Sequence, residues 1–178
     1  FIAEDVLTDL DSALYLDVDL IALRDLYDLQ HLNFEGNIFA AATEYMEMDR
    51  RASCGLNYTY VNIGVVVENL KLMRESKNAA YLTKKYYEDL GASNQTPYND
   101  LKSNTCFALP NQDMFNRIYK DKIKFISRRW NYLPIYEYNA KLMPFIIHFA
   151  GTKPSDDSNS LEDLLYMRYK KLVEDIIK

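Results

Sequence analysis

The sequence predicts an α/β fold with a sheet that is at least partly parallel. Short apolar runs of strand length, such as Ala13 to Leu16, alternate along the chain with segments of helical pattern. Such alternation is typical of parallel strands joined by helices. The chain has 178 residues, 48% of them hydrophobic, which is enough to bury one globular core.

In the first half of the chain, the apolar runs are short and bounded by charge. Ala13 to Leu16 are too few for a helix and stop sharply at Asp17, so we predict a buried strand. A glycine at position 64, inside an apolar β-branched run, indicates a bulge or a close approach of the backbone to another group. In order, we predict a helix over 1–10, strands over 13–16 and 20–23, helical turns over 24–30, and strands over 37–43 and 60–68.

In the second half, helical pattern prevails and the turn signals are clearer. Asn111 follows Pro110 and is suited to cap a helix, and Ser160 to Asp163 resemble a capping box. In order, we predict a helix over 69–90, a loop over 92–109, a helix from 111 to 119, strands over 122–126 and 145–149, and a helix over 160–178.

Charge and composition exclude several classes of protein. The chain has 26 acidic and 21 basic residues, a net charge of −5, which argues against a general nucleic-acid binder. The longest apolar runs are strand-sized, so neither a signal peptide nor a transmembrane segment is predicted. Cys54 and Cys106 lack zinc-ligand or disulfide spacing and are interpreted as buried or idle thiols. We expect a cytoplasmic protein, or one of the Golgi lumen in a eukaryote.

Asp17 and Asp19 directly follow the predicted strand 13–16. Acids at the end of a buried strand lie at the edge where open α/β sheets bind ligands, and side chains two residues apart share one side of the backbone. Two carboxylates about 5 Å apart repel by roughly 3 kcal/mol at an effective dielectric near 20. Water or a divalent cation would relieve that repulsion, and a bound cation would hold a phosphate. A solvated loop is the alternative interpretation.

His148 ends the predicted strand 145–149. A lone histidine there is usually a hydrogen-bonded core residue, and it becomes a candidate metal ligand only if its strand lies beside strand 13–16. Two carboxylates and one imidazole would suit Mn²⁺, whereas Mg²⁺ accepts nitrogen less readily. Gly151 and Lys153 follow, and they could admit and neutralise a phosphate or be an ordinary loop glycine and surface lysine.

Amides form a second group of candidates. Asn62 would need partners in a strand, which could be sugar hydroxyls or backbone, and Asn111, Gln112 and Asp113 could cap a helix or grip a polyol. Arg128-Arg129-Trp130 is interpreted as a surface patch. Neither a Ser-His-Asp or Cys-His arrangement nor a phosphate-binding glycine loop is recognisable in the sequence.

Four motifs, taken in order, resemble glycosyltransferase family eight, which includes bacterial lipopolysaccharide galactosyl- and glucosyltransferases and glycogenin. Together they extend across nearly the whole chain, which makes the set far more specific than any one motif. The motifs are Tyr15-Leu16-Asp17-Val18-Asp19, Tyr60-Val61-Asn62-Ile63-Gly64-Val65 with Asn69-Leu70, Asn111-Gln112-Asp113-Met114-Phe115-Asn116, and His148-Phe149-Ala150-Gly151-Thr152-Lys153-Pro154.

The resemblance implies a GT-A type α/β fold with a mixed sheet flanked by helices, a UDP-hexose donor, Mn²⁺ (with Mg²⁺ as the alternative) and retention at the anomeric carbon. It also implies a carbohydrate or glycolipid acceptor and is compatible with peripheral contact with a membrane. By position, the implied metal ligands are Asp17, Asp19 and His148; the implied donor contacts are Asn62, Gly64, Asn111, Gln112, Gly151 and Lys153; and the implied catalytic pair is Gln112, near the reacting carbon, with Asp113 supporting it.

The chain departs from the family pattern at several points. Asn111 stands where aspartate is common, Ser155 replaces a tryptophan, and the spacing from Gly151 to Lys153 is one residue short. Family members also carry an N-terminal βα segment that contacts uracil and ribose, and the chain begins after it, so we expect the first strands of the sheet to be missing.

We therefore expect a partial catalytic domain over residues 1–155 and a loop and helix over 156–178 that pack on it. The alternatives are a non-catalytic relative that binds a nucleotide sugar, an inactive fragment, and an interaction module whose acidic pair is only surface.

Overall fold

The computed structural model describes residues 3–44, 58–78, 80–82, 84–85, 110–135, 143–151, 154 and 160–177. The helices are α1 (Ala3–Val6), α2 (Tyr27–Gln30), α4 (Leu70–Glu75), α6 (Pro110–Tyr119), α7 (Leu161–Ile177) and the 3₁₀ helix η2 (Arg128–Asn131). The strands are β1 (Ala13–Leu16), β2 (Leu20–Ala22), β3 (Phe39–Thr43), β4 (Val61–Glu68), β5 (Ile123–Ile126) and β6 (Ile146–His148).

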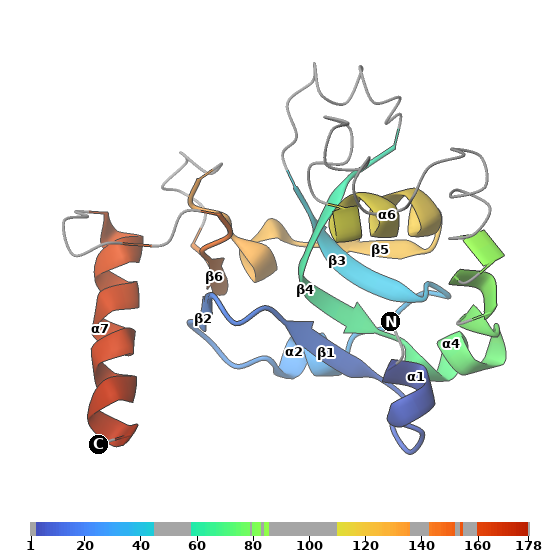
Figure 1. The fold of residues 1–178 in the computed structure, drawn as a ribbon, viewed down its shortest axis with the longest axis horizontal. Coiled ribbons are helices and arrows are strands. Elements are labelled where there is room, and N and C mark those ends of the chain that lie inside the picture. Colours follow the sequence, from blue (N-terminus) through green and yellow to red (C-terminus); the bar gives the residue numbers. More distant parts are fainter. Residues whose placement is uncertain are drawn as a thin grey trace.

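The strands form two sheets (Figure 1). The larger has the order β1-β4-β3-β5, in which β3 and β5 run parallel and the other neighbours antiparallel. The smaller pairs β2 with β6 antiparallel. All six predicted strands are present, and the mixed sheet, parallel in one pair only, agrees with the predicted fold class.

Helices cover both faces of the larger sheet, which explains why its central strands, β3 and β4, are mostly apolar and almost wholly buried. Neighbouring residues of β3 point to opposite faces: Phe39 and Ala41 pack in one buried cluster, and Ala40 packs in the other. The first cluster is completed by Leu70 and Met73 of α4 and by Phe115, Ile118 and Tyr119 of α6. The second is completed by Leu29 of α2 and Trp130 of η2.

Two helices differ from those that the sequence predicts. The helix expected over 1–10 spans only Ala3–Val6, because the guanidinium of Arg74 donates to the carbonyl oxygens of Leu7 and Leu10 and binds them outside a helix. The helix expected over 69–90 is interrupted: α4 ends at Glu75, Lys77 adopts a φ of 53°, and helical backbone resumes at residues 78, 80–82 and 84–85. Residues 86–90 lie outside the described part.

The predicted patch Arg128-Arg129-Trp130 is only partly at the surface. Trp130 is buried, and its ring meets that of Phe145 edge to face at 4.7 Å. The guanidinium of Arg129 lies over the Phe145 ring, 3.7 Å from the centroid of that ring. The patch prediction is therefore wrong for Trp130, whose indole belongs to the core that η2 closes.

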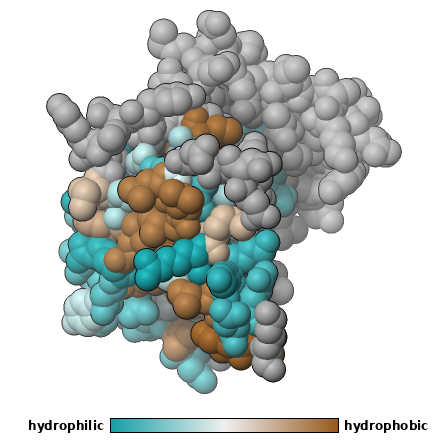
Figure 2. Space-filling view, turned by 90° about the vertical axis from the view of Figure 1, so that its left-hand side faces the viewer, coloured by the Kyte–Doolittle hydropathy of each residue, from teal (hydrophilic) through white to brown (hydrophobic). Residues whose placement is uncertain are grey.

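Helix α7 stands at one side of the molecule, near β2 and β6 (Figure 1). Its start is capped as predicted, since the Ser160 hydroxyl accepts from the Asp163 amide at 3.0 Å. None of its residues is buried, but Tyr166 packs against Phe149 with ring centroids 5.0 Å apart. Figure 2 shows apolar and polar surface side by side on this face. Among the described helices, none combines the length and apolarity that crossing a bilayer requires.

Candidate active site

Asp17 and Asp19 lie where the chain leaves the larger sheet and enters the smaller one. The Asp17 amide donates to the Gly64 carbonyl at 2.8 Å, which fixes it to β4, and the Asp19 carbonyl accepts from the Phe149 amide at 2.9 Å, just after β6. Val18 between them is fully exposed. The two carboxylates therefore turn inward together, as side chains two residues apart in extended backbone do.

His148 completes a three-residue cluster with these acids. Its Nε2 lies 3.4 Å from Asp17 Oδ2 and 3.3 Å from Asp19 Oδ1, and its side chain is 2% exposed. The three candidate ligand atoms lie within 4.8 Å of one another. We expected His148 to join the acids only if its strand lay beside the strand over 13–16, which is β1. That expectation is wrong. Strand β6 pairs with β2, and there His148 is opposite Leu20, one residue after Asp19.

The imidazole is held from behind by a buried amide. Asn131 Oδ1 lies 2.8 Å from His148 Nδ1. Because an amide oxygen only accepts, Nδ1 is the nitrogen that donates to Asn131, and Nε2 is the ring nitrogen that faces the acids. A metal-binding histidine typically makes such a bond through its second nitrogen.

Gly64 of β4 makes room for this ring. A Cβ at position 64 would lie 2.1 Å from His148 Cε1 and 2.8 Å from Asp17 Oδ2. The pairing of β4 with β3 also shifts register here, between Ala41 and Thr43. The structure thus combines both features that the sequence indicated for this glycine, and the group it approaches is the candidate metal ligand.

The cluster has the chemistry of a divalent cation site. Two carboxylate oxygens and one imidazole nitrogen form a donor set that fits Mn²⁺. The Tyr15 hydroxyl donates to Asp17 Oδ1 at 2.7 Å, leaving Oδ2 toward His148. This bond to Asp17 is the main reason that the pKa of Tyr15 rises to about 12.

A cluster of amides lies beside the acids, where α6 meets β4. The Gln112 side chain accepts from the Ile63 amide at 3.1 Å and donates to Glu44 Oε2 at 2.6 Å. Asn62 donates to the same Glu44 oxygen at 3.1 Å. One carboxylate thus orients two of the amides that the sequence singled out.

The first turn of α6 is fixed by buried polar bonds. Asp113 accepts from the Tyr60 hydroxyl at 2.6 Å, and burial with this bond raises the pKa of Tyr60. Asn116 bonds both backbone groups of Val61, which fixes the helix to β4. Asn111 is exposed within this turn, so the prediction that it is the N-cap is wrong. The helix begins at Pro110, a residue whose fixed φ suits a first helical position.

The remaining predicted site residues lie further along the chain. Gly151 adopts a φ of 88°, which favours glycine, and it is exposed three residues after His148. Lys153, Cys54 and Cys106 lie outside the described residues, as does the expected boundary at residues 155–156.

Two residues of the site were not predicted from the sequence. Glu44 directly follows strand β3, just as Asp17 follows β1, so the same signal of an acid after a buried strand could have found it. Asn131 follows a buried tryptophan in η2, and its neighbours in the sequence give no comparable signal.

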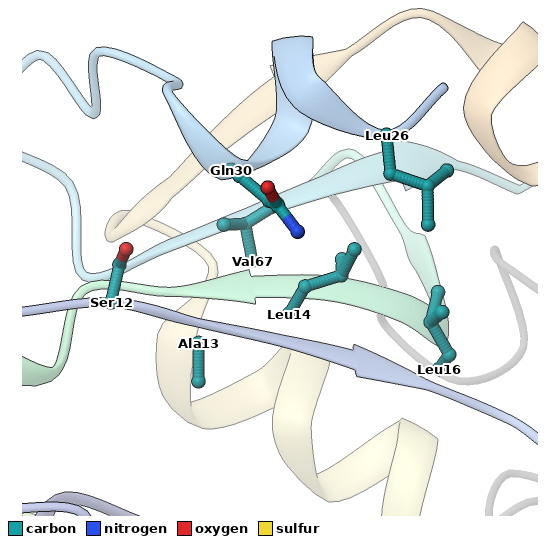
Figure 3. A pocket seen from close by; sticks show the side chains of 7 residues that line it. All are labelled: Ser12, Ala13, Leu14, Leu16, Leu26, Gln30 and Val67. Carbon is teal, nitrogen blue, oxygen red and sulfur yellow. The ribbon is translucent and has the colours of Figure 1, made fainter. Parts of the chain in front are cut away.

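A separate cavity of about 450 Å³ lies between β1 and α2. Figure 3 shows the side chains of Leu14, Leu26 and Gln30, which line this cavity. Its other lining residues are Ser12, Ala13, Leu16 and Val67. The acids, His148 and the amides are not part of its lining, so the cavity and the candidate metal centre are distinct.

Comparison with known proteins agrees with this architecture. A family model described as Glycosyl transferase family 8 matches residues 1–157. A lipopolysaccharide 1,2-glucosyltransferase of Escherichia coli strain K12 is 27% identical over 165 residues, covering 82% of this chain and 44% of that protein. A second Escherichia coli enzyme of that name is 27% identical and covers 89% and 49%. The chain thus spans less than half the length of the curated relatives it matches here.

Solved structures show the same fold. The galactosyltransferase LgtC, in complex with donor and acceptor sugar analogs, matches with a TM-score of 0.63 at 18% identity, over 92% of this chain and 62% of that one. The glycosyltransferase GlyE of Streptococcus pneumoniae matches with a TM-score of 0.64 at 22% identity, over 94% and 41%. The predicted GT-A type fold is confirmed.

Proposed function

Because the chain belongs to glycosyl transferase family 8, we propose that it contributes the metal-binding part of a retaining glycosyltransferase that moves a hexose from a UDP-sugar to a glycan, lipopolysaccharide or protein acceptor. The observation that carries the proposal is the convergence of Asp17, Asp19 and His148 from two distant segments. The similarity to lipopolysaccharide glucosyltransferases supports a sugar acceptor.

In this proposal the acids and the imidazole hold Mn²⁺, with Mg²⁺ as the alternative. The bound cation would supply Lewis acidity to a departing diphosphate. The cluster is suited to this role because an uncompensated pair of carboxylates repels, whereas a divalent cation between them is bound by both. Gly151 would admit the diphosphate closely, and Lys153 would add a compact positive charge.

The amides would bind the donor sugar. The side chain of Gln112 accepts from the Ile63 amide, donates to Glu44 and also hydrogen-bonds the Tyr60 hydroxyl. Its oxygen keeps one acceptor site with which to bind a sugar hydroxyl. Asn62 is placed beside it by the same carboxylate, and Asp113 holds the start of α6 through Tyr60.

A non-catalytic relative that binds the nucleotide sugar without turnover is the second candidate. It is favoured by Asn111, an amide where family members commonly have aspartate, which stands exposed in the first turn of α6. The two candidates share the metal centre and differ only in turnover.

Calorimetry on the full polypeptide tests the metal centre. We expect UDP binding that depends on Mn²⁺, is abolished by a chelator and is lost in Asp19→Ala. Asp9→Ala removes one exposed acid ahead of β1 and should bind like the unmodified protein. Equal UDP affinity with and without metal, or in Asp19→Ala, would reject the assignment. Release of UDP from a UDP-hexose then separates an enzyme from a binding protein.

A further inference from the structure

We propose that Asn131 is a positioning residue that orients the His148 ring for a metal ion and, through Asn62 and Glu44, the Gln112 amide for the donor. This inference rests on the proposed function and deepens it. It joins the metal centre and the amide cluster, which lie on different elements, into one hydrogen-bonded unit.

The unit is a continuous chain of side chains. Asn131 accepts from His148 Nδ1 at 2.8 Å and donates to Asn62 Oδ1, also at 2.8 Å. Asn62 donates to Glu44 Oε2 at 3.1 Å, and Gln112 donates to the same oxygen at 2.6 Å. Glu44 is thus the acceptor that links Asn62, which leads to the metal centre, with Gln112, which would contact the sugar.

Two backbone amides of β4 fix the direction of every bond. The Gly64 amide donates to Asn62 Oδ1 at 2.8 Å, so this oxygen faces β4 and the Asn62 nitrogen must turn to Glu44. Asn131 must then give its nitrogen to Asn62 and its oxygen to His148. The Ile63 amide fixes Gln112 in the same way, because it donates to Oε1 at 3.1 Å.

This hydrogen-bonded network of side chains is buried over most of its length. His148, Asn131, Asn62 and Gln112 are each no more than 6% exposed. A buried polar group needs its partner, and a network in which each member is satisfied is rigid. Replacing Asn131 therefore affects both ends, although it is itself neither an acid nor a predicted metal ligand.

Two substitutions at position 131 separate the two links. Asn131→Ala removes both bonds, so Mn²⁺ affinity should fall by roughly 10- to 100-fold, as for other residues that orient a metal-binding histidine. Asn131→Asp keeps an acceptor for His148 but puts an oxygen against Asn62 Oδ1. It should retain most of the Mn²⁺ affinity while the rate of UDP-hexose turnover falls.

The control is Asn78→Ala. Asn78 is equally buried, and it donates to Glu4 Oε1 at 3.2 Å. This part of the core shares no residue with the hydrogen-bonded network around Asn131. This variant should lose thermal stability and keep the Mn²⁺ affinity of the unmodified protein. A purely structural role for Asn131 would make Asn131→Ala behave in the same way.

The readouts are the free Mn²⁺ signal in electron paramagnetic resonance at constant UDP, the thermal midpoint, and kcat and KM for UDP-hexose. Unchanged Mn²⁺ affinity in Asn131→Ala, or unchanged kcat in Asn131→Asp, overturns the inference while the proposed function stands. Should Asn131→Ala not fold, the near-isosteric Asn131→Asp decides the matter by its kcat. An unmodified protein that binds no Mn²⁺ overturns the proposed function and this inference together.

Discussion

Gly64 and His148 are packed so closely that the glycine hydrogen occupies the only space a side chain could use. A methyl group there would lie 2.1 Å from the imidazole Cε1 and 2.7 Å from Nδ1. The ring is buried, and Asn131 and the acids surround it, so it has little room to retreat.

We therefore expect Gly64→Ala to weaken Mn²⁺-dependent UDP binding by at least tenfold, because the ring must leave its position facing Asp17 and Asp19. Calorimetry measures this directly. Gly36→Ala is the matched control: its φ of 82° makes alanine unfavourable by roughly 1–2 kcal/mol, but no atom lies within 4 Å of the new methyl group. It should lower stability and leave UDP binding intact. Equal losses of UDP binding in both variants would contradict the prediction.

Removing the Tyr60 hydroxyl should destabilise the start of α6. This hydroxyl donates to buried Asp113 at 2.6 Å, and a buried acceptor that loses a partner costs about 1–3 kcal/mol. Tyr60→Phe should accordingly lower the thermal midpoint by several degrees, measured by circular dichroism. Tyr169→Phe, on the exposed side of α7, should leave the midpoint unchanged. A Tyr60→Phe midpoint equal to that of the unmodified protein would show that the bond contributes nothing.

Glu68 gives a prediction for pH dependence. It is buried at the end of β4, and burial raises the pKa of its carboxyl above the usual value of 4.5. The folded state therefore favours the neutral acid more strongly than the unfolded chain does. The resulting contribution to stability is fully present below the pKa that Glu68 has in the unfolded chain. It is lost as pH rises through the pKa of Glu68 in the folded protein, because a charge must then be buried.

The neutral variant Glu68→Gln should then unfold at a higher temperature than the unmodified protein at pH 7, and the difference should disappear near pH 4. Thermal melts at both pH values measure this. Glu75→Gln, an exposed change of the same kind, should show no such pH-dependent gain. A stabilisation by Glu68→Gln that is equal at both pH values would argue against a buried charge as its cause.

The sequence predicts the strands and the acidic pair because both depend on local pattern. Ala13 to Leu16 and the acids after them are adjacent, so the edge position of Asp17 and Asp19 can be inferred without knowing any neighbour. The pairing that brings His148 to them is different. β2 and β6 are short and distant in sequence, and their register is set by how the whole core folds.

Long-range contacts also account for what was not predicted. Arg74 ends the helix near Leu7 and Leu10 by binding their carbonyl oxygens, which no local propensity encodes. Asn131 acquires its role from His148 and Asn62, both far away in the sequence. Such residues can be recognised only once the fold has placed them together.

The contact between α7 and the smaller sheet gives the last prediction. Tyr166 and Leu165 pack on a cluster that contains Phe149 and Ile147, the two neighbours of His148. The ring of Tyr166 meets that of Phe149 nearly edge to face, 5.0 Å between centroids. This is a small apolar contact for a helix of 17 residues without a buried side chain, so its loss should free the helix.

Tyr166→Ala should therefore make residues 160–177 more susceptible to limited proteolysis, with the products identified by mass spectrometry. Tyr169→Ala removes a tyrosine one turn further along the helix that is 43% exposed and lies outside the cluster, so its cleavage rate should equal that of the unmodified protein. Because His148 is also held by its backbone bond to the Tyr132 carbonyl and by Asn131, Mn²⁺-dependent UDP binding should persist in Tyr166→Ala. Equal cleavage of the two variants would mean that the Tyr166 contact does not hold α7 in place.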